Sequence, residues 1–258
     1  MIQSRKISLD PIHISGWRWK PFLDILISQL SQFPLEPYPI PINFLDNDVS
    51  LGTSNKPLQV KTSTWACSTK KIRQARVACV QAKNVASVFN LVIAPLPEFD
   101  LPFLGVDLVT LPTGHLLALD LQPALKYDLQ HTGKVWDQLL PIYQKWKDFL
   151  PDGGPIPKDA DRYFSPGFLW TRIPIGDSGD KLIDDIIKPA FSQYLSLFLD
   201  LITNSKKVDE KRSKLILEGQ KEYMKYRAQK DPARGMLTRF YGIDWTENYI
   251  NNVLFDLQ

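Results

Sequence analysis

Hydrophobic and polar positions follow a strand-like pattern through the middle of the chain. Between residues 57 and 123, short runs rich in β-branched residues are separated by turn residues, and 112–114 reads Pro-Thr-Gly, a typical tight turn. This pattern predicts an antiparallel meander of strands over residues 59–67, 72–80, 85–95, 105–111 and 115–121. One more strand is predicted over 167–173.

The spacing of apolar residues becomes helical on both sides of this region. It predicts helices over residues 17–30, 134–150, 182–202, 208–227 and 244–254. Pro141 is expected to kink or divide its helix, and Pro189 to require a local adjustment. The Asp-Pro-Ala-Arg-Gly segment at 231–235 ends the charged helix, and Asp244 is the predicted N-cap of the last one.

The remaining segments are predicted to be irregular. They are an N-terminal arm over 1–16, a proline-rich extended loop over 33–43 and a loop over 151–166. Strands in the middle and helices at both ends predict a layered α+β fold. Because no repeat, low-complexity linker or boundary interrupts the pattern, we expect residues 1–258 to form a single domain.

Composition excludes several classes of protein. With 31 basic and 28 acidic residues the net charge is +3, too balanced to indicate a nucleic-acid-binding protein. No apolar run approaches the length of a membrane span, and the first residues resemble neither a signal peptide nor a transit peptide. Two cysteines and three scattered histidines give no disulfide framework and no metal-ligand spacing, and no glycine-rich phosphate loop is present.

Asp107 is a carboxylate inside the apolar run 99–109. In a strand it would point to one face while its apolar neighbours point to the other. Burial would disfavour its ionised form and raise its pKa, which is how a protein keeps a proton available near neutral pH. The alternative is a structural aspartate at a strand end or bulge that caps a turn.

Other polar residues lie in apolar or broken contexts. Asn90 is inside a predicted strand, and its alternative interpretation is a turn or bulge residue. Asp231 lies at the Asp-Pro break, where a helix N-cap is the common use. Arg227 is one helical turn before Asp231 and could bind an anion or pair with it. His115 is expected to be structural rather than a catalytic base.

Basic side chains are concentrated between two predicted strands. This cluster consists of Lys70, Lys71, Arg73 and Arg76. It is interpreted either as a docking surface for an acidic partner or substrate carboxylates, or as a solvated turn. The mixed charges of 206–212 indicate a solvated helix surface.

With these residues identified, the sequence resembles the ferredoxin-dependent bilin reductases. Among the matching segments are Leu-Pro-Phe-Leu-Gly-Val-Asp-Leu-Val at 101–109, Tyr-Phe-Ser-Pro-Gly-Phe-Leu-Trp-Thr-Arg at 163–172 and Asp-Pro-Ala-Arg-Gly-Met-Leu at 231–237. Shorter matches lie at 65–67, 73–76, 88–90, 119–123, 245–246 and 254–255. Each segment alone is weak, but their order and joint presence are specific and run over nearly the whole chain.

The resemblance implies a three-layer α/β/α sandwich with a central antiparallel sheet. It implies that a linear tetrapyrrole binds between the sheet and the C-terminal helices. It also implies that no metal, flavin or other cofactor is bound. Reduced ferredoxin would deliver electrons one at a time from outside, and the protein would supply the protons.

The resemblance also assigns roles to particular residues. Asp107 matches the family's central sheet aspartate, and Asp231 the aspartate on the helical side, so both are expected to donate protons. Asn90 stands where phycocyanobilin-forming members carry a histidine, which favours the branch that reduces the A-ring diene of 15,16-dihydrobiliverdin to phycoerythrobilin. Arg227 and Arg172 are expected to bind substrate, with Asn90 positioning a pyrrole or lactam group.

Partners and alternatives follow from the same resemblance. Ferredoxin and a bilin are the expected partners, with a second bilin reductase or a bilin lyase as a channelling partner, and the chain is expected to be a monomer. Cyanobacterial cytoplasm is the expected location, with plastid stroma as the alternative. Competing functions are a reductase that starts from biliverdin and a non-enzymatic bilin carrier.

Overall fold

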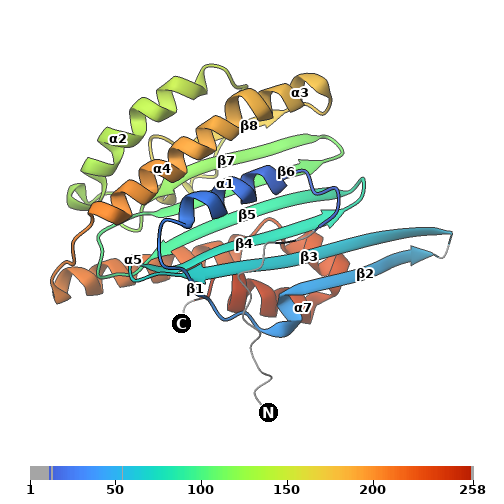
Figure 1. The fold of residues 1–258 in the computed structure, drawn as a ribbon, viewed down its shortest axis with the longest axis horizontal. Coiled ribbons are helices and arrows are strands. Elements are labelled where there is room, and N and C mark those ends of the chain that lie inside the picture. The colour runs from blue at the N-terminus through green and yellow to red at the C-terminus, as the bar shows by residue number, and fades with distance from the viewer. Residues whose placement is uncertain (1–11, 13, 54, 257–258) are drawn as a thin grey trace, which may run out of the picture.

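The fold is built on one eight-stranded antiparallel sheet, which confirms the predicted meander (Figure 1). The computed structural model describes residue 12, residues 14–53 and residues 55–256, so most of the predicted N-terminal arm lies outside the described residues. The strands are β1 (Glu36–Pro37), β2 (Asp46–Thr53), β3 (Lys56–Ser68), β4 (Ile72–Ala82), β5 (Ala86–Pro95), β6 (Phe103–Leu111), β7 (Gly114–Gln122) and β8 (Leu169–Ile173). Their order is β1-β3-β4-β5-β6-β7-β8, and β2 also pairs with β3.

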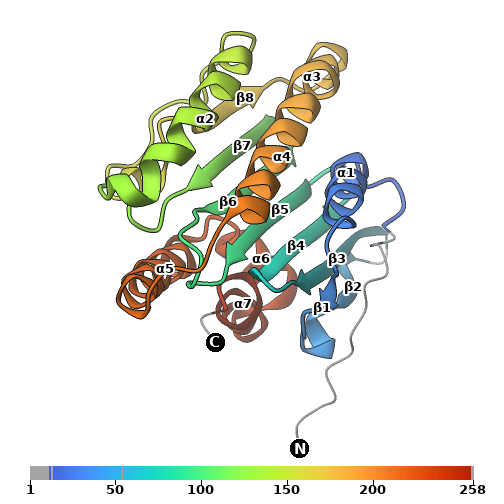
Figure 2. The same cartoon turned by 60° about the vertical axis from the view of Figure 1, so that its left-hand side comes forward.

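Helices cover both faces of the sheet, so the predicted three-layer sandwich is confirmed (Figures 1 and 2). One layer contains α1 (Lys20–Leu30), α2 (Leu129–Lys147), α3 (Asp177–Leu182) and α4 (Lys188–Asn204). The other contains α5 (Glu210–Lys230), α6 (Arg234–Tyr241) and α7 (Ile243–Tyr249). We call these sides the α4 face and the α5 face. None of the helices among the described residues is long and apolar enough to span a bilayer.

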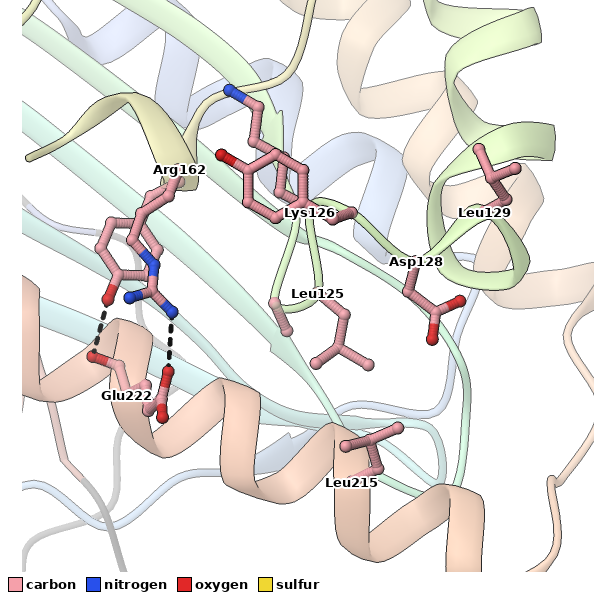
Figure 3. A pocket seen from close by; sticks show the side chains of 10 residues that line it. Leu125, Lys126, Asp128, Leu129, Arg162, Leu215 and Glu222 are labelled. Carbon is pink, nitrogen blue, oxygen red and sulfur yellow. Dashed lines mark hydrogen bonds and ion pairs between the residues drawn. The ribbon is translucent and has the colours of Figure 1, made fainter. Parts of the chain in front are cut away.

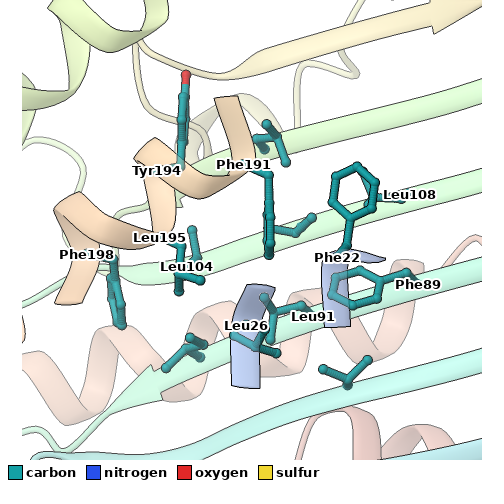
Figure 4. Close-up of a cluster of buried hydrophobic side chains, with 14 of the residues drawn as sticks. Phe22, Leu26, Phe89, Leu91, Leu104, Leu108, Phe191, Tyr194, Leu195 and Phe198 are labelled. Carbon is teal, nitrogen blue, oxygen red and sulfur yellow. The ribbon is translucent and has the colours of Figure 1, made fainter. Parts of the chain in front are cut away.

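Side-chain alternation along the strands gives the sheet two apolar cores. On the α4 face, leucine and phenylalanine side chains of β5 and β6 pack against α1 and α4 (Figure 4). On the α5 face a second core contains Phe103, Tyr223 and Phe255. A polar side chain that is buried on either face must find its hydrogen-bond partners inside the protein.

Three local predictions needed the structure to settle them. Pro141 does not divide its helix, because α2 continues through it, and Pro141 lies on the exposed side of α2. The adjustment expected at Pro189 is present as a π-helical turn, Ile183–Ile187, directly before α4. Asp244 is not an N-cap: Gly242, with a φ of 82°, begins α7, and Asp244 lies in its first turn.

Candidate active site

Five polar side chains predicted from the sequence come together on the α5 face of the sheet. Arg76 on β4, Asn90 on β5 and Asp107 on β6 point to this face, and Arg227 on α5 and Asp231 directly after α5 approach it from the helical layer. The strand register explains the grouping, because Asn90 lies directly opposite Asp107 on the neighbouring strand.

A continuous hydrogen-bond chain joins the sheet residues. Arg76 Nη1 donates to the backbone carbonyl of Asn90 at 3.1 Å and also to its Oδ1 atom. Asn90 Nδ2 donates in turn to Asp107 Oδ1. Both Asn90 and Asp107 lie within regular pairing, so the bulge and strand-end interpretations of these two residues are wrong.

Arg227 supplies the positive charge that faces Asp107 from the helical layer. Its Nη2 atom is 3.5 Å from Asp107 Oδ2, and its Nη1 atom donates to the Tyr223 hydroxyl at 3.3 Å. Its guanidinium lies 5.3 Å from the ring centre of Phe255. Burial alone would lower the pKa of Arg227, but Tyr223, Asp107 and Asp231 outweigh burial and raise it above its ordinary value.

The helix N-cap interpretation of Asp231 is wrong, because Ala233 is the N-cap of α6 and Asp231 is the C-cap of α5. Its Oδ1 atom accepts a hydrogen bond from the Ala233 backbone at 2.7 Å, a local turn that leads into α6. The residue is only 9% exposed, and burial raises the pKa of its carboxyl group even though the nearby Arg227 lowers it. The structure therefore places a carboxyl group with a raised pKa beside Arg227.

Asp107 is less buried than its apolar sequence context indicates. Its side chain is 38% exposed. The same face of β6, β7 and β8 carries a partly exposed, mainly apolar surface that starts at Asp107. This open sheet surface consists of Val109, Leu116, Ala118 and Trp170. The opposite faces of these strands are buried, so the α5 face is where a flat apolar ligand could reach Asp107.

Arg172 lies on this face but outside the hydrogen-bonded cluster. Arg172 is on the edge strand β8, where it lies opposite Leu116 of β7, and its side chain is exposed. Its guanidinium lies 5.7 Å from the Trp170 ring centre. It can therefore contact a ligand that extends along the open sheet surface, but not one confined to Asp107.

An aromatic row that sequence reasoning missed stands beside the open sheet surface. Phe164 stacks on Phe168 with 4.0 Å between ring centres, and Phe168 lies parallel to Trp170 at 6.3 Å. All three are partly exposed. The signal was present, because the row belongs to the segment 163–172 that carried the family resemblance. Stacked, partly exposed rings are suited to contact a flat conjugated ligand.

Asp120 is another residue that sequence reasoning missed. It is fully buried on β7, where its Oδ2 atom accepts the Ser165 backbone N–H at 2.9 Å and its Oδ1 atom accepts the Ser165 hydroxyl. Burial raises its pKa from 3.8 to about 7, although both hydrogen bonds from Ser165 lower it. Asp120 thus fixes the loop that carries Phe164 and Phe168.

This raised pKa predicts a pH-dependent stability. The folded state keeps the Asp120 proton between about pH 4 and pH 7, whereas the unfolded state releases it, so stability should fall as the pH rises through this window. From pH 5 to pH 8 we expect this carboxyl to remove about 2–3 kcal/mol from the free energy of unfolding. Urea unfolding at several pH values measures it.

The Asp120→Asn variant isolates this contribution. It should lack that part of the pH dependence, while Asp48→Asn, at an exposed carboxylate on β2, should retain it. Identical slopes for Asp120→Asn and wild type would contradict the assignment.

The basic cluster does not form one surface. Arg76 is fully buried and its Nη2 atom donates to the Leu254 carbonyl at 3.0 Å, so a docking role for Arg76 is wrong; burial lowers its pKa. Arg73 donates to the Asp256 carbonyl at 3.0 Å. Lys71 binds carbonyl groups at the end of α4, and of the four residues only Lys70 is exposed. Neither of the two interpretations, a single docking surface or a solvated turn, therefore describes all four residues.

The remaining titratable candidates are structural. His115 is fully buried and its Nδ1 atom lies 3.0 Å from the Thr110 hydroxyl, and burial lowers its pKa to about 4. Cys67 and Cys79 are free and buried. Among the described residues, no group of three His, Cys, Asp or Glu side chains is arranged to hold a metal ion.

A cavity of about 650 Å³ lies next to the site, between the β7–α2 connection, the 161–163 turn and α5 (Figure 3). Leu125, Leu129 and Leu215 give it apolar walls. Its charged groups are already paired, Arg162 with Glu222 at 2.8 Å and Lys126 with Asp161 at 2.8 Å. The cavity is therefore nearly neutral at its rim.

Comparisons with known proteins give matches over nearly the whole chain. A family model described as "Ferredoxin-dependent bilin reductase" matches residues 23–256. A phycoerythrobilin:ferredoxin oxidoreductase from Parasynechococcus marenigrum (strain WH8102) is 58% identical, with 100% of this chain and 98% of the relative covered. One from Prochlorococcus marinus (strain MIT 9211) is also 58% identical, with 100% of both chains covered.

A solved structure is also similar. The crystal structure of selenomethionine phytochromobilin synthase from tomato in complex with biliverdin is 25% identical, with a TM-score of 0.81. The match covers 93% of this chain and 83% of that one. These matches include the sheet and the C-terminal helices, the two layers that meet at the Asp107 cluster.

Proposed function

The chain belongs to the ferredoxin-dependent bilin reductase family, and from this premise we propose that it reduces 15,16-dihydrobiliverdin to phycoerythrobilin. The reaction adds two electrons and two protons to the A-ring diene system. Two molecules of reduced ferredoxin supply the electrons, and aspartates of the chain supply the protons. The relatives that bear the name phycoerythrobilin:ferredoxin oxidoreductase support this choice of product.

One observation carries the proposed mechanism: two carboxyl groups approach the same arginine from opposite layers. Asp107 comes from the sheet and Asp231 from the end of α5, and both act electrostatically on Arg227. A flat tetrapyrrole between the layers would meet one acid on each side. Because the bilin radical formed by each electron must be protonated at a chosen carbon, positioned general acids decide the product.

The other residues have positioning roles. Asn90 donates to Asp107 and accepts from Arg76, so its amide is oriented before a substrate binds. It would fix a pyrrole or lactam group at this point. Arg227 balances the charge of the acids, and Arg172 is placed to bind a substrate carboxylate at the far end of the open sheet surface.

An anaerobic assay with reduced ferredoxin tests the function. Biliverdin and 15,16-dihydrobiliverdin are offered separately, with absorbance spectra and chromatography of the products. We expect only 15,16-dihydrobiliverdin to be consumed, giving phycoerythrobilin. Turnover of biliverdin would overturn the assigned substrate, and tight binding of both bilins without turnover would make the chain a bilin carrier.

The cellular setting is part of the proposal. The similar oxidoreductases come from cyanobacteria, and we place this chain in the cytoplasm of such a cell, with the plastid stroma as the alternative.

A further inference from the structure

Three exposed lysines from two distant segments meet at one end of the sheet. Lys70 lies in the β3–β4 turn, and Lys206 and Lys207 lie in the α4–α5 connection. Lys71 joins the two segments, because its Nζ atom donates to the carbonyls of Ile202 at 2.9 Å and Ser205 at 2.8 Å. We call Lys70, Lys206 and Lys207 the lysine edge.

The positive charge of the lysine edge is only partly offset nearby. Within the described part of the chain, none of its three ammonium groups forms an ion pair. Among the neighbouring carboxylates, Asp209 keeps its charge while it accepts the Arg212 backbone N–H, and Glu210 pairs with Lys214 at 2.6 Å. Glu98 is only partly exposed. An acidic protein would therefore meet a local excess of positive charge here.

The lysine edge is connected to the candidate active site through the C-terminal segment. Arg73 holds the Asp256 carbonyl and Arg76 holds the Leu254 carbonyl, each at 3.0 Å. Phe255, between them, is buried against the Arg227 guanidinium. Since a strand rises roughly 3.3 Å per residue, β4 spans only about 10 Å from Arg73 to Arg76. The lysine edge therefore lies at the end of β4 that is nearer to Arg76, a residue of the candidate site.

We propose that the lysine edge is the docking surface for reduced ferredoxin, taken as an acidic iron–sulfur protein. This inference rests on the proposed function, which requires such a donor. The cavity of Figure 3 is the less suitable surface, because its lysine and arginine side chains already pair with carboxylates. Unpaired surface charges steer association with an oppositely charged partner, so they act mainly on the encounter of the two proteins.

Charge reversal tests the surface. The triple variant Lys70→Glu, Lys206→Glu, Lys207→Glu is compared with the control Lys56→Glu, Lys83→Glu, Lys181→Glu. The control lysines are exposed and lie at the opposite end of the sheet (Figure 1): Lys56 is the first residue of β3, Lys83 lies in the β4–β5 turn and Lys181 on α3. Both variants change the net charge equally, so a general charge effect would appear in both.

The first readout is the Kd for ferredoxin, measured by calorimetry on the full chain at low and high salt. At low salt we expect the edge variant to bind at least tenfold more weakly than the control, and the difference to shrink at high salt. The Kd for the bilin should be unchanged in both. Equal ferredoxin affinity in the two variants would overturn the docking surface.

Failure of the proposed function can be distinguished from failure of the proposed docking surface. If wild type reduces biliverdin instead of 15,16-dihydrobiliverdin, the substrate is wrong, while a weakened Kd for ferredoxin in the edge variant still supports the surface. Conversely, correct turnover by wild type with equal KM for ferredoxin in both variants rejects the surface alone.

Discussion

Replacing Asp107 by asparagine should lower the turnover of the accepted bilin by about 10²–10⁴-fold, the usual contribution of a positioned general acid. Asparagine keeps the size of the side chain and an oxygen that can accept from Asn90 Nδ2, but it has no proton to give. Bilin affinity should therefore change little. Anaerobic single-turnover reduction by ferredoxin gives the rate, and the absorbance change on mixing gives the affinity.

A matched control separates chemistry from surface charge. Asp48→Asn removes an exposed carboxylate on β2 that pairs with Lys61 on β3 at 3.1 Å, and this variant should turn over the bilin like wild type.

Asp231→Asn should also lose turnover. Because Asp231 accepts a hydrogen bond from the Ala233 backbone, the fold of this variant is checked by circular dichroism. Full turnover by Asp107→Asn would remove Asp107 from the proton-donating role.

The sheet could be predicted because each of its central strands is covered on the α4 face by an apolar core. That burial places hydrophobic residues in every central strand and leaves turn residues between them. The missed strands are β1, two residues inside the segment 33–43 that was predicted to be a loop, and β2, which pairs only with β3. The reason is clearest for β2. Its sequence, Asp-Asn-Asp-Val-Ser-Leu-Gly-Thr, is largely exposed, so little burial is encoded in it. Its pairing depends on β3 rather than on its own pattern.

The sheet residues Asp107 and Asn90 of the candidate site could also be predicted, because they interrupt apolar strands. The partners of the basic cluster could not be predicted from the sequence. Lys71, Arg73 and Arg76 are neighbours in the sequence, yet their partners are α4, Asp256 and Asn90, which belong to different parts of the chain. No local pattern distinguishes a lysine that binds a helix end from one that faces solvent. For the same reason the lysine edge could not be predicted, because Lys70 and the pair Lys206 and Lys207 are far apart in the sequence and come together only in the fold.

Asp120 shows a different limit. In the sequence it alternates with leucines on β7 like any polar residue of a half-exposed strand. In the structure it is buried and accepts two hydrogen bonds from Ser165, in the loop before β8. Its raised pKa is therefore a property of the loop as much as of the strand.

Replacing Arg76 by methionine should have the largest effect on stability. Its guanidinium donates to the Asn90 side chain, the Asn90 carbonyl and the Leu254 carbonyl, and it is fully buried. Methionine fills part of the space but leaves these acceptors without donors in a low-dielectric interior. Relief of the buried positive charge offsets part of this loss. We expect the free energy of unfolding to fall by about 3 kcal/mol, measured by urea unfolding.

The comparison variants identify which property of Arg76 matters. Arg172→Met removes an exposed arginine from the same face of the sheet and should change stability by less than about 0.5 kcal/mol. Arg76→Lys keeps the charge but cannot reach Asn90 and Leu254 together with one ammonium group, so it should lie between Arg76→Met and wild type. If Arg76→Met were as stable as wild type, the C-terminal segment would be held without this arginine. The connection between Leu254 and Asn90 would then have to come from packing of Phe255 alone.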